Sequence, residues 1–430
     1  MECRALKYEA ELKDRKISLF FTFIIVTMPI INNYSSPLHS IGISEFILLI
    51  FIPVMIFDMV INRITIKPYG YWLFWLYGIL ISLVMVAAHS DFSVYNAVIR
   101  LLRDTFYACV IFLFAQKYFN LKYALNLYKY LSIMACIYLI LQCISFYVFH
   151  YTLPWILHGI SLNYTITDTS AYSQLYKNFY GKFYFRATSV FLEPAQFAQF
   201  VAPCLALTLF PCSGKKRIDY RSAVFFSISL LMSTSANGYA FTAVIWIVWY
   251  LYNCFSSKYH VSIIAIFISG VLAVTVVILL YKYNSLFNFD ANRIINIGGQ
   301  KNNSANMRVL KGFYTFHALD SVFKIFGIGF GNYDSFVSVY PVTAIYDVSS
   351  EYMSSLSYIL VSSGIIGLCA FLSAICAIFK EVILPGKILI ILLLIMFLSS
   401  SIYSSPIYSV IFAFILSMPP KANKYMELTV

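Results

Sequence analysis

The sequence predicts an all-α integral membrane protein with about twelve transmembrane helices. Three observations lead to this prediction. Hydrophobic residues make up 61% of the 430-residue chain, against roughly 45–50% in soluble globular proteins. Charged residues make up 11%, where roughly 25% is typical. The apolar residues also form runs of the roughly 17–25 residues that a helix needs to cross a bilayer. A soluble globular protein, a disordered chain and a disulfide-rich scaffold are therefore excluded.

The predicted membrane spans follow one another along the whole chain. They lie near 17–34, 41–61, 70–88, 98–116, 124–149, 188–211, 222–236, 238–255, 261–281, 352–379, 388–403 and 406–418. A polar segment precedes the first run and no small-residue cleavage site follows it, so this run is predicted to be a retained helix rather than a signal peptide. Two pairs of spans are joined by tight turns, at Ser235–Gly238 and at Ser404–Pro406.

The distribution of Lys and Arg predicts the direction in which the chain crosses the bilayer. Most of the 30 Lys and Arg lie in alternate loops, including the N-terminal tail, the cluster Lys215–Arg221 and the C-terminal tail. Because cytoplasmic loops carry an excess of positive charge, this side and both termini are predicted to be cytoplasmic. The resulting division is 1–149 with helices 1–5, 150–187 as a first long outer loop, 188–281 with helices 6–9, 282–351 as a second long outer loop with an amphipathic helix, and 352–430 with helices 10–12 and a cytoplasmic tail.

Cations on the outer side need a separate explanation. The net charge of +12 would suggest a nucleic acid partner in a soluble protein. Here topology accounts for much of the charge, and no nucleic acid partner is expected. Long loops cross the membrane largely regardless of charge, so cations in them are not topology signals. The outer side contains Arg100, Arg103, Arg186, Arg293, Arg308 and Lys311. Such a surface suits an anionic ligand such as a phosphate, and plain solvated charge is the alternative.

Three segments carry a more specific pattern. They are the stretch from Arg186 through Glu193-Pro194 into the sixth span, the stretch from Arg308 to the Gly-x-Gly-x-Gly sequence 327–331, and the Gly-Ile-Ile-Gly sequence 364–367 in the tenth span. In this order, and on one side of the membrane, they resemble the O-antigen polymerase (Wzy) family, within the O-antigen polymerase and ligase superfamily. The resemblance covers mainly residues 180–370 and the topology.

The resemblance implies a glycosyltransferase of the bacterial inner membrane, with both long loops in the periplasm. Its substrates would be undecaprenyl-pyrophosphate-linked oligosaccharides. The terminal hydroxyl of one lipid-linked repeat unit attacks the anomeric carbon of another, and undecaprenyl pyrophosphate leaves. No cofactor is implied. The implied partners are the lipid bilayer and, for chain length, a separate regulator protein.

Two alternative functions remain open from the sequence. An O-antigen ligase usually has a His at the position that Met353 occupies here, which favours the polymerase. A lipid-linked oligosaccharide flippase has a similar number of helices and a similar composition. A flippase is expected to carry its ionisable groups inside the helix bundle and to have short loops on both sides. The two long outer loops favour the polymerase over this transporter.

The catalytic candidates are Glu193, Arg186 and Arg308. Glu193 follows Arg186 by seven residues, so the two share a helix face if the helix is continuous. Pro194 favours another arrangement, in which Glu193 caps the helix and Pro194 is its first residue. Under the resemblance, Glu193 orients or deprotonates the acceptor hydroxyl, and the two arginines bind pyrophosphate. An ion pair or helix cap without a catalytic role is the structural alternative.

The substrate-binding candidates are Arg293, Lys311, Arg100, Arg103 and His317. Asp104 directly follows the two arginines of the fourth span, so an ion pair is an alternative interpretation there. The Gly-x-Gly-x-Gly sequence is more typical of close packing than of a phosphate loop. No metal-binding pattern is evident in the sequence.

An amphipathic helix is predicted near 304–326. Its apolar stripe consists of Leu310, Tyr314, Ala318, Val322 and Ile325, and we expect this stripe to rest on the membrane or on the helix bundle. Lys311 flanks the stripe beside Arg308. His317, a candidate general base, falls on the opposite face from Arg308 if the helix is continuous.

Overall fold

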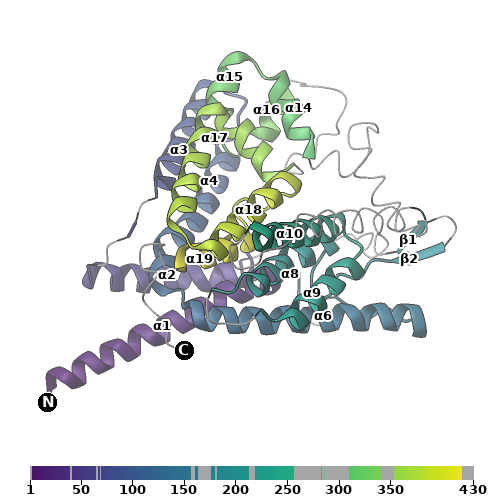
Figure 1. The fold of residues 1–430 in the computed structure, drawn as a ribbon. Helices are drawn as coiled ribbons and strands as arrows, with labels where there is room; N and C mark the ends of the chain where they lie inside the picture. Colours follow the sequence, from purple (N-terminus) through teal and green to yellow (C-terminus); the bar gives the residue numbers. More distant parts are fainter. Residues whose placement is uncertain are drawn as a thin grey trace. The chain divides into compact units, whose positions relative to one another are not determined.

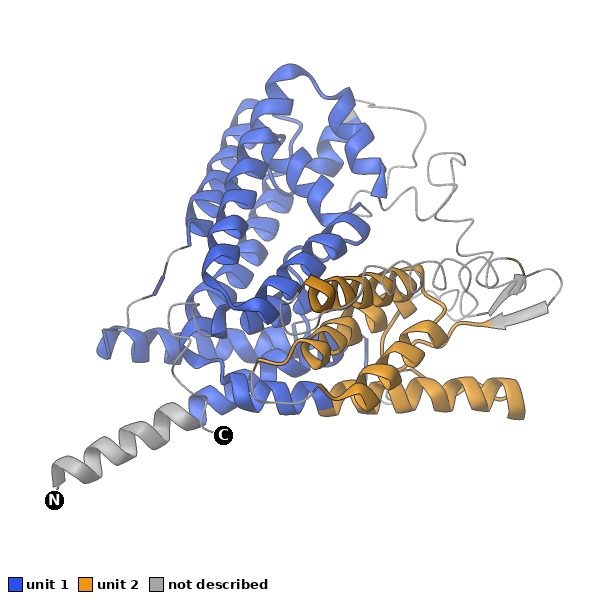
Figure 2. Cartoon of the chain, in the orientation of Figure 1, with its two compact units in different colours: residues 1–129, 160–164, 306–430 blue, residues 130–159, 165–305 orange. Residues whose placement is uncertain are grey.

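The computed structural model describes residues 2–38, 41–63, 66–67, 69–155, 160–162, 176–179, 182–212, 218–255, 282, 309–339 and 353–418. These residues are mainly helical, as Figure 1 shows. They belong to two compact units, coloured separately in Figure 2. Unit 1 comprises residues 1–129, 160–164 and 306–430, and unit 2 comprises residues 130–159 and 165–305.

Unit 1 contains helices from both ends of the chain. They are α1 (Glu2–Ile31), α2 (Ile43–Ile61), α3 (Tyr71–Ala88), α4 (Val94–Cys109), the π-helical turn η1 (Val110–Ala115), α5 (Gln116–Tyr118), the start of α6 (Leu121–Phe149), α14 (Lys311–Ala318), α15 (Ser321–Phe326), α16 (Tyr333–Val339), α17 (Ser355–Glu381), α18 (Leu384–Ser399) and α19 (Pro406–Ser417). The long helices α3 and α17 pack against each other. Their contact brings together segments that are almost 300 residues apart in sequence.

Unit 2 is built on the remainder of α6. It adds α8 (Pro194–Leu209), α9 (Tyr220–Met232) and α10 (Ala236–Phe255), and α8 packs against both of the others. It also contains two antiparallel strands, β1 (Tyr176–Phe179) and β2 (Lys182–Phe185), with Tyr176 opposite Phe185. These strands lie in the stretch 150–187, which the sequence predicts only as a first long outer loop. Aromatic residues recur along both segments and favour pleated structure.

Five of the described helices are long and apolar enough to span a membrane, namely α2, α3, α6, α10 and α17. Five shorter apolar helices accompany them, at Lys16–Ile31, Pro194–Leu209, Tyr220–Met232, Leu384–Ser399 and Pro406–Ser417. The predicted helical membrane fold is therefore confirmed in this coarser form. The predicted span at 261–281 lies outside the described residues.

The loops of unit 1 that the charge pattern assigns to the outer side lie together at one end of the helices. Ser93, before α4, donates its backbone amide to the Ser335 hydroxyl on α16 over 3.3 Å. Ser355, at the start of α17, donates its backbone amide to the carbonyl of Ser400, after α18, over 2.9 Å. Segments that are distant in sequence thus meet at one common end.

The loops assigned to the other side meet at the opposite end of unit 1. Lys67, between α2 and α3, forms an ion pair of 2.9 Å with Glu381 at the end of α17, and this carboxylate raises the pKa of the lysine. The Lys67 amide also donates to the side chain of Gln116, at the start of α5, over 3.2 Å. These contacts join three segments that are distant in sequence at this end of unit 1.

Gly327 and Gly364 bring α15 and α17 into backbone contact. Both have positive φ angles, of 89° and 64°. A Cβ atom on Gly327 would lie 2.3 Å from the carbonyl oxygen of Ser362, and one on Gly364 would lie 2.3 Å from that of Ile325. Only residues without a side chain fit here, and Gly364 is also the position where the helical geometry of α17 is interrupted.

The predicted continuous helix near 304–326 is wrong in one respect. The structure breaks it into α14 and α15, because Leu319 and Asp320 are both extended, with ψ angles of 150° and 158°. Asp320 occupies the N-cap position of α15, and its carbonyl accepts the backbone amide of Lys324 over 2.9 Å. The predicted stripe does not pack on the bundle: Tyr314, Val322 and Ile325 are exposed.

Candidate functional site: buried charges in unit 1

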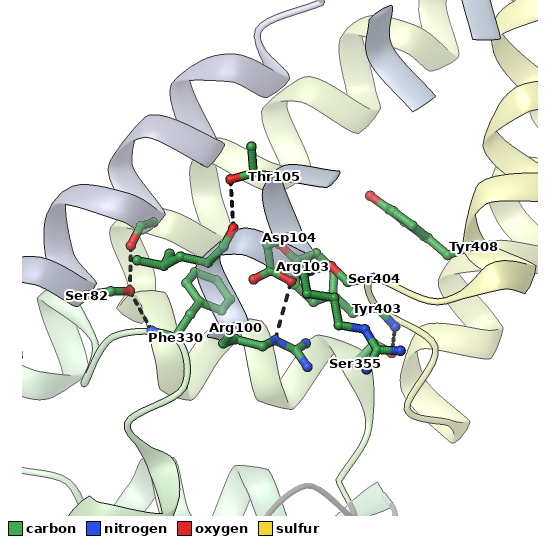
Figure 3. A network of polar contacts seen from close by, with 12 residues as sticks. Ser82, Arg100, Arg103, Asp104, Thr105, Phe330, Ser355, Tyr403, Ser404 and Tyr408 are labelled. Carbon is green, nitrogen blue, oxygen red and sulfur yellow. Dashed lines mark hydrogen bonds and ion pairs between the residues drawn. The ribbon is translucent and has the colours of Figure 1, made fainter. Parts of the chain in front are cut away.

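Arg100 and Asp104 form an ion pair inside unit 1. They lie one turn apart on α4, with Arg100 Nε 3.3 Å from Asp104 Oδ1, and their side chains are 14% and 5% exposed. The hydroxyl of Ser404, in the turn between α18 and α19, donates to the same carboxylate oxygen over 2.5 Å. These side chains point toward one another in Figure 3. The alternative interpretation of a structural ion pair is confirmed for Arg100.

Two tyrosine rings enclose the Arg100 guanidinium. Its carbon Cζ lies 4.8 Å from the ring centroid of Tyr358 on α17 and 5.7 Å from that of Tyr403 in the α18–α19 turn. Both distances are within the range of cation–π attraction, about 6 Å. Arg100 therefore has a carboxylate and two aromatic faces as partners, which is what a buried charge requires.

The α18–α19 turn is positioned by one serine at the start of α17. The Ser355 hydroxyl donates to the carbonyl of Ser400 over 2.8 Å. It also accepts the backbone amides of Ile402, at 2.7 Å, and of Tyr403, at 3.0 Å. Local sequence supports this arrangement, because α19 begins with Pro406 at its first position after a Ser405 cap.

A second buried carboxylate lies close to the first pair. Glu45, in the first turn of α2, accepts the backbone amide of Gly42 over 3.2 Å and the hydroxyl of Tyr107 on α4. Arg103 Nη2 lies 3.7 Å from the Glu45 carboxylate oxygen Oε1. The Arg103 side chain is 49% exposed, whereas that of Glu45 is only 10% exposed. The carboxylate thus orients a cation that reaches the surface of unit 1.

The two arginines, three residues apart on α4, differ in accessibility. Arg100 is enclosed and its charge is matched by Asp104, whereas Arg103 is half exposed beside Glu45. The four charges sum to zero, which limits the cost of placing them within the helices. Arg103 is consequently the better candidate for contact with an anionic ligand, and Arg100 for holding the structure together.

Two further candidates, Lys311 and His317, lie on α14 of unit 1. Lys311 is buried at the start of α14, with Nζ 5.8 Å from the ring centroid of Tyr333. His317 is exposed in the last turn of α14. Arg293 and Arg308 lie outside the described residues.

Glu193 and Arg186 lie in unit 2. Glu193 is extended, with φ −135° and ψ 150°, and Pro194 is the first residue of α8, which confirms the predicted cap. The alternative prediction that Arg186 and Glu193 share one helix is therefore wrong, because α8 begins only after Glu193. Arg186 Nη2 donates to the carbonyl of Thr234, between α9 and α10, over 3.3 Å.

The backbone amides of the Gly-x-Gly-x-Gly sequence bind other parts of the protein. The amides of Ile328 and Gly329 donate to the carbonyls of Val361 and Ser362 on α17, over 3.1 and 2.8 Å. The Phe330 amide donates to the hydroxyl of Ser82 on α3 over 2.8 Å. Close packing, the favoured interpretation of these glycines, is confirmed.

Sequence reasoning missed Glu45, Tyr107, Tyr358 and Ser404. Glu45 carries a usable signal, because an ionisable residue within an apolar run is a functional candidate by default. The tyrosines and the serine carry none, since many similar residues face lipid or pack in the core. Among the residues that the structure describes, no group of His, Cys, Asp or Glu is arranged to hold a metal ion.

Comparison of the sequence with known proteins gives no match to any family model and no match to a curated protein. The resemblance to O-antigen polymerases therefore stays a prediction that rests on the motifs alone.

Proposed function

We propose that this protein polymerises undecaprenyl-pyrophosphate-linked O-antigen repeat units at the periplasmic face of the bacterial inner membrane. The observation that carries the proposal is Arg103, a half-exposed guanidinium held 3.7 Å from a buried Glu45 carboxylate within apolar helices. A guanidinium can bind two phosphate oxygens at once and stays charged at any working pH. Such a cation suits a lipid-linked pyrophosphate, whose hydrocarbon chain lies in the bilayer.

The proposed reaction transfers a glycan between two lipid carriers. The terminal hydroxyl oxygen of the acceptor forms a bond to the anomeric carbon of the donor. The bond from that carbon to the pyrophosphate oxygen breaks, and undecaprenyl pyrophosphate leaves with the electron pair. Cations such as Arg103 stabilise the negative charge that develops on the leaving group. The acceptor proton goes to a base. Glu193 remains the base that the resemblance implies, and Arg186, Arg293 and Arg308 remain the phosphate contacts that it implies.

The proposed membrane arrangement has about twelve spans with both termini in the cytoplasm. The end of unit 1 that contains Arg103 and Ser404 would face the periplasm, and the end that contains Lys67 and Glu381 would face the cytoplasm. Grouping of the loops at these two ends supports the proposal, because charge alone assigned them to opposite sides. A separate protein that regulates chain length is a proposed partner.

A flippase for lipid-linked oligosaccharides is the second candidate. One observation favours it: Asp104 and Glu45 are buried within unit 1, where the Arg100 side chain is only 14% exposed. Transporters place ionisable residues along their substrate path. In a polymerase the same groups hold the leaving-group site. The two functions differ in product, because only a polymerase lengthens the glycan.

The test uses the full chain in nanodiscs supplied with one purified lipid-linked repeat unit. The proposal predicts products of two or more repeats and release of undecaprenyl pyrophosphate. Arg103→Gln should lower the rate roughly 10- to 100-fold, because a hydrogen bond to a charged group contributes about 1.5–3 kcal/mol. Arg63→Gln, an exposed arginine at the opposite end of unit 1, is the matched control and should retain full activity. A flippase would give no longer glycans in nanodiscs. The same protein reconstituted in vesicles would instead move the lipid-linked repeat unit from one leaflet to the other.

A further inference from the structure

The segment between α15 and α16 lies beside the middle of α3 rather than beyond its end. The Phe330 amide binds the Ser82 hydroxyl over 2.8 Å, and a Cβ atom on Gly78 would lie 2.9 Å from the Phe330 ring. Ser82 precedes the end of α3 at Ala88 by six residues, which is about 9 Å along the helix, and Gly78 by about 15 Å.

The contacts of α17 indicate the same depth for this segment independently of α3. Gly364 touches the backbone of Gly327 and follows the start of α17 at Ser355 by nine residues, about 13 Å along the helix. The contacts with α3 and α17 thus place residues 327–330 well below the ends of these two helices, at a level along the helix axes that lies between the first and last residues of each. The sequence alone predicts that these residues belong to the second long outer loop, 282–351.

At this depth, α3 and α17 present hydrocarbon side chains outward. Leu80, Leu83 and Val84 are exposed on α3, and Ile365 and Ile366 on α17. Both helices are candidate membrane spans, so their exposed leucines and isoleucines face acyl chains. Irregular backbone is tolerated at this level only where the protein satisfies its polar groups. The internally bonded amides of Ile328, Gly329 and Phe330 meet that requirement.

The outward face of α15 is apolar. Val322, Ile325 and Phe326 are 60%, 44% and 43% exposed. The Tyr77 hydroxyl on α3 donates to the Phe326 carbonyl over 2.8 Å, so this face adjoins the lipid-facing surface of α3. Exposing three large apolar side chains to water on one six-residue helix would cost free energy. Continuity with α3 indicates that lipid covers them.

We propose that α15 and residues 327–330 form a re-entrant segment, which enters one half of the bilayer and contacts acyl chains through Val322, Ile325 and Phe326. The segment ends against α4, where a Cβ atom on Gly331 would lie 2.9 Å from Cβ of Arg100. It therefore supports the helix that carries both arginines of the cluster. This inference requires only that the chain spans a membrane, and it holds for a polymerase or a flippase.

The test is quenching of a tryptophan at position 325 by lipid bromine atoms. The full chain carrying Ile325→Trp is reconstituted in vesicles of phosphatidylcholine brominated midway along one acyl chain, and the fluorescence added over the unsubstituted protein is measured. Leu80→Trp on α3 is the lipid-facing reference, and His317→Trp, exposed on α14 beyond the Leu319–Asp320 break, is the control outside the bilayer.

We expect Ile325→Trp to lose as large a fraction of its added fluorescence as Leu80→Trp, and His317→Trp to lose little. Val322→Trp gives a second reading on the same face if Ile325→Trp does not fold. Quenching at position 325 or 322 no greater than at position 317 would overturn the proposal, because α15 would then lie in water.

Discussion

Ser404 donates a hydrogen bond of 2.5 Å to Asp104, although 300 residues separate them in the sequence. The same carboxylate oxygen lies 3.3 Å from Nε of Arg100. One buried acid therefore joins α4 to the turn between α18 and α19, while the Tyr358 ring on α17 covers the arginine. We therefore expect this carboxylate to stabilise unit 1 at the end where the candidate ligand site lies.

Asp104→Asn is expected to destabilise the protein by about 3–5 kcal/mol, the usual cost of leaving one member of a buried ion pair without its partner. Thermal unfolding in detergent measures the effect. Asp91→Asn, an exposed change in the turn between α3 and α4, should leave the midpoint unchanged. Adding Arg100→Met to Asp104→Asn should recover part of the loss, because no unpaired charge then remains. An unaltered midpoint for Asp104→Asn alone would show that the pair does not hold the unit together.

Arg103 and Arg100 should respond differently to the same substitution. Arg103→Gln is expected to lower the turnover of lipid-linked substrate. It should lower the unfolding midpoint less than Arg100→Gln does, since the Arg103 side chain is half exposed and Glu45 keeps its hydrogen bonds from Gly42 and Tyr107. Arg100→Gln should instead lower the midpoint, because it leaves Asp104 buried without its cation. Comparing the rate and the midpoint for both variants tests the division of roles. Equal losses of stability would argue against it.

Glu45 is expected to act through Arg103. Glu45→Gln keeps an oxygen for the Tyr107 hydroxyl but removes the charge that orients the guanidinium. We predict a higher KM for the lipid-linked donor with a smaller change in kcat, and recovery toward wild-type KM in Glu45→Asp. Steady-state kinetics in nanodiscs give both values. If kcat and KM stay at wild-type levels in Glu45→Gln, Glu45 has no positioning role.

Gly327→Ala and Gly364→Ala should each destabilise the protein more than Gly70→Ala does. All three have positive φ angles. Gly70 is in the left-handed region, which costs an alanine about 1–2 kcal/mol. Gly327 and Gly364 have ψ angles of 172° and −170°, in a region that essentially only glycine adopts. Only at positions 327 and 364 would the new methyl also meet backbone atoms at 2.3 Å, whereas nothing lies within 4 Å of it at position 70. Overpacking adds about 1–3 kcal/mol. Unfolding midpoints that are equal for all three variants would contradict the close contact of α15 with α17.

The helices were largely predictable, because an apolar run is a local property of the chain. Pro194 and Pro406 begin α8 and α19 as expected, since proline is favoured at the first helical position. The break at Leu319 and Asp320 was not predicted, because the apolar period continues through it. Here Asp320 begins a new helix whose Phe323 is buried.

The candidate site was predictable only in part. Arg100, Arg103 and Asp104 attract attention as charges in one apolar stretch. Their partners Glu45, Tyr358 and Ser404 come from three distant segments, and no local pattern connects a serine near the end of the chain with an acid on α4. The exposure that separates Arg103 from Arg100 is likewise set by tertiary packing rather than by their three-residue spacing.

The most direct test of the proposed polymerase is a gel of cell-surface lipopolysaccharide from a strain that lacks this protein. We predict that the ladder collapses to core carrying a single repeat unit, because export and ligation continue without polymerisation. The wild-type chain should restore the ladder, and the Arg103→Gln chain should restore it poorly. Loss of all repeats, with lipid-linked units accumulating on the cytoplasmic side, would contradict the account and indicate a flippase. Intact polymer accumulating on the lipid carrier would contradict it in favour of a ligase.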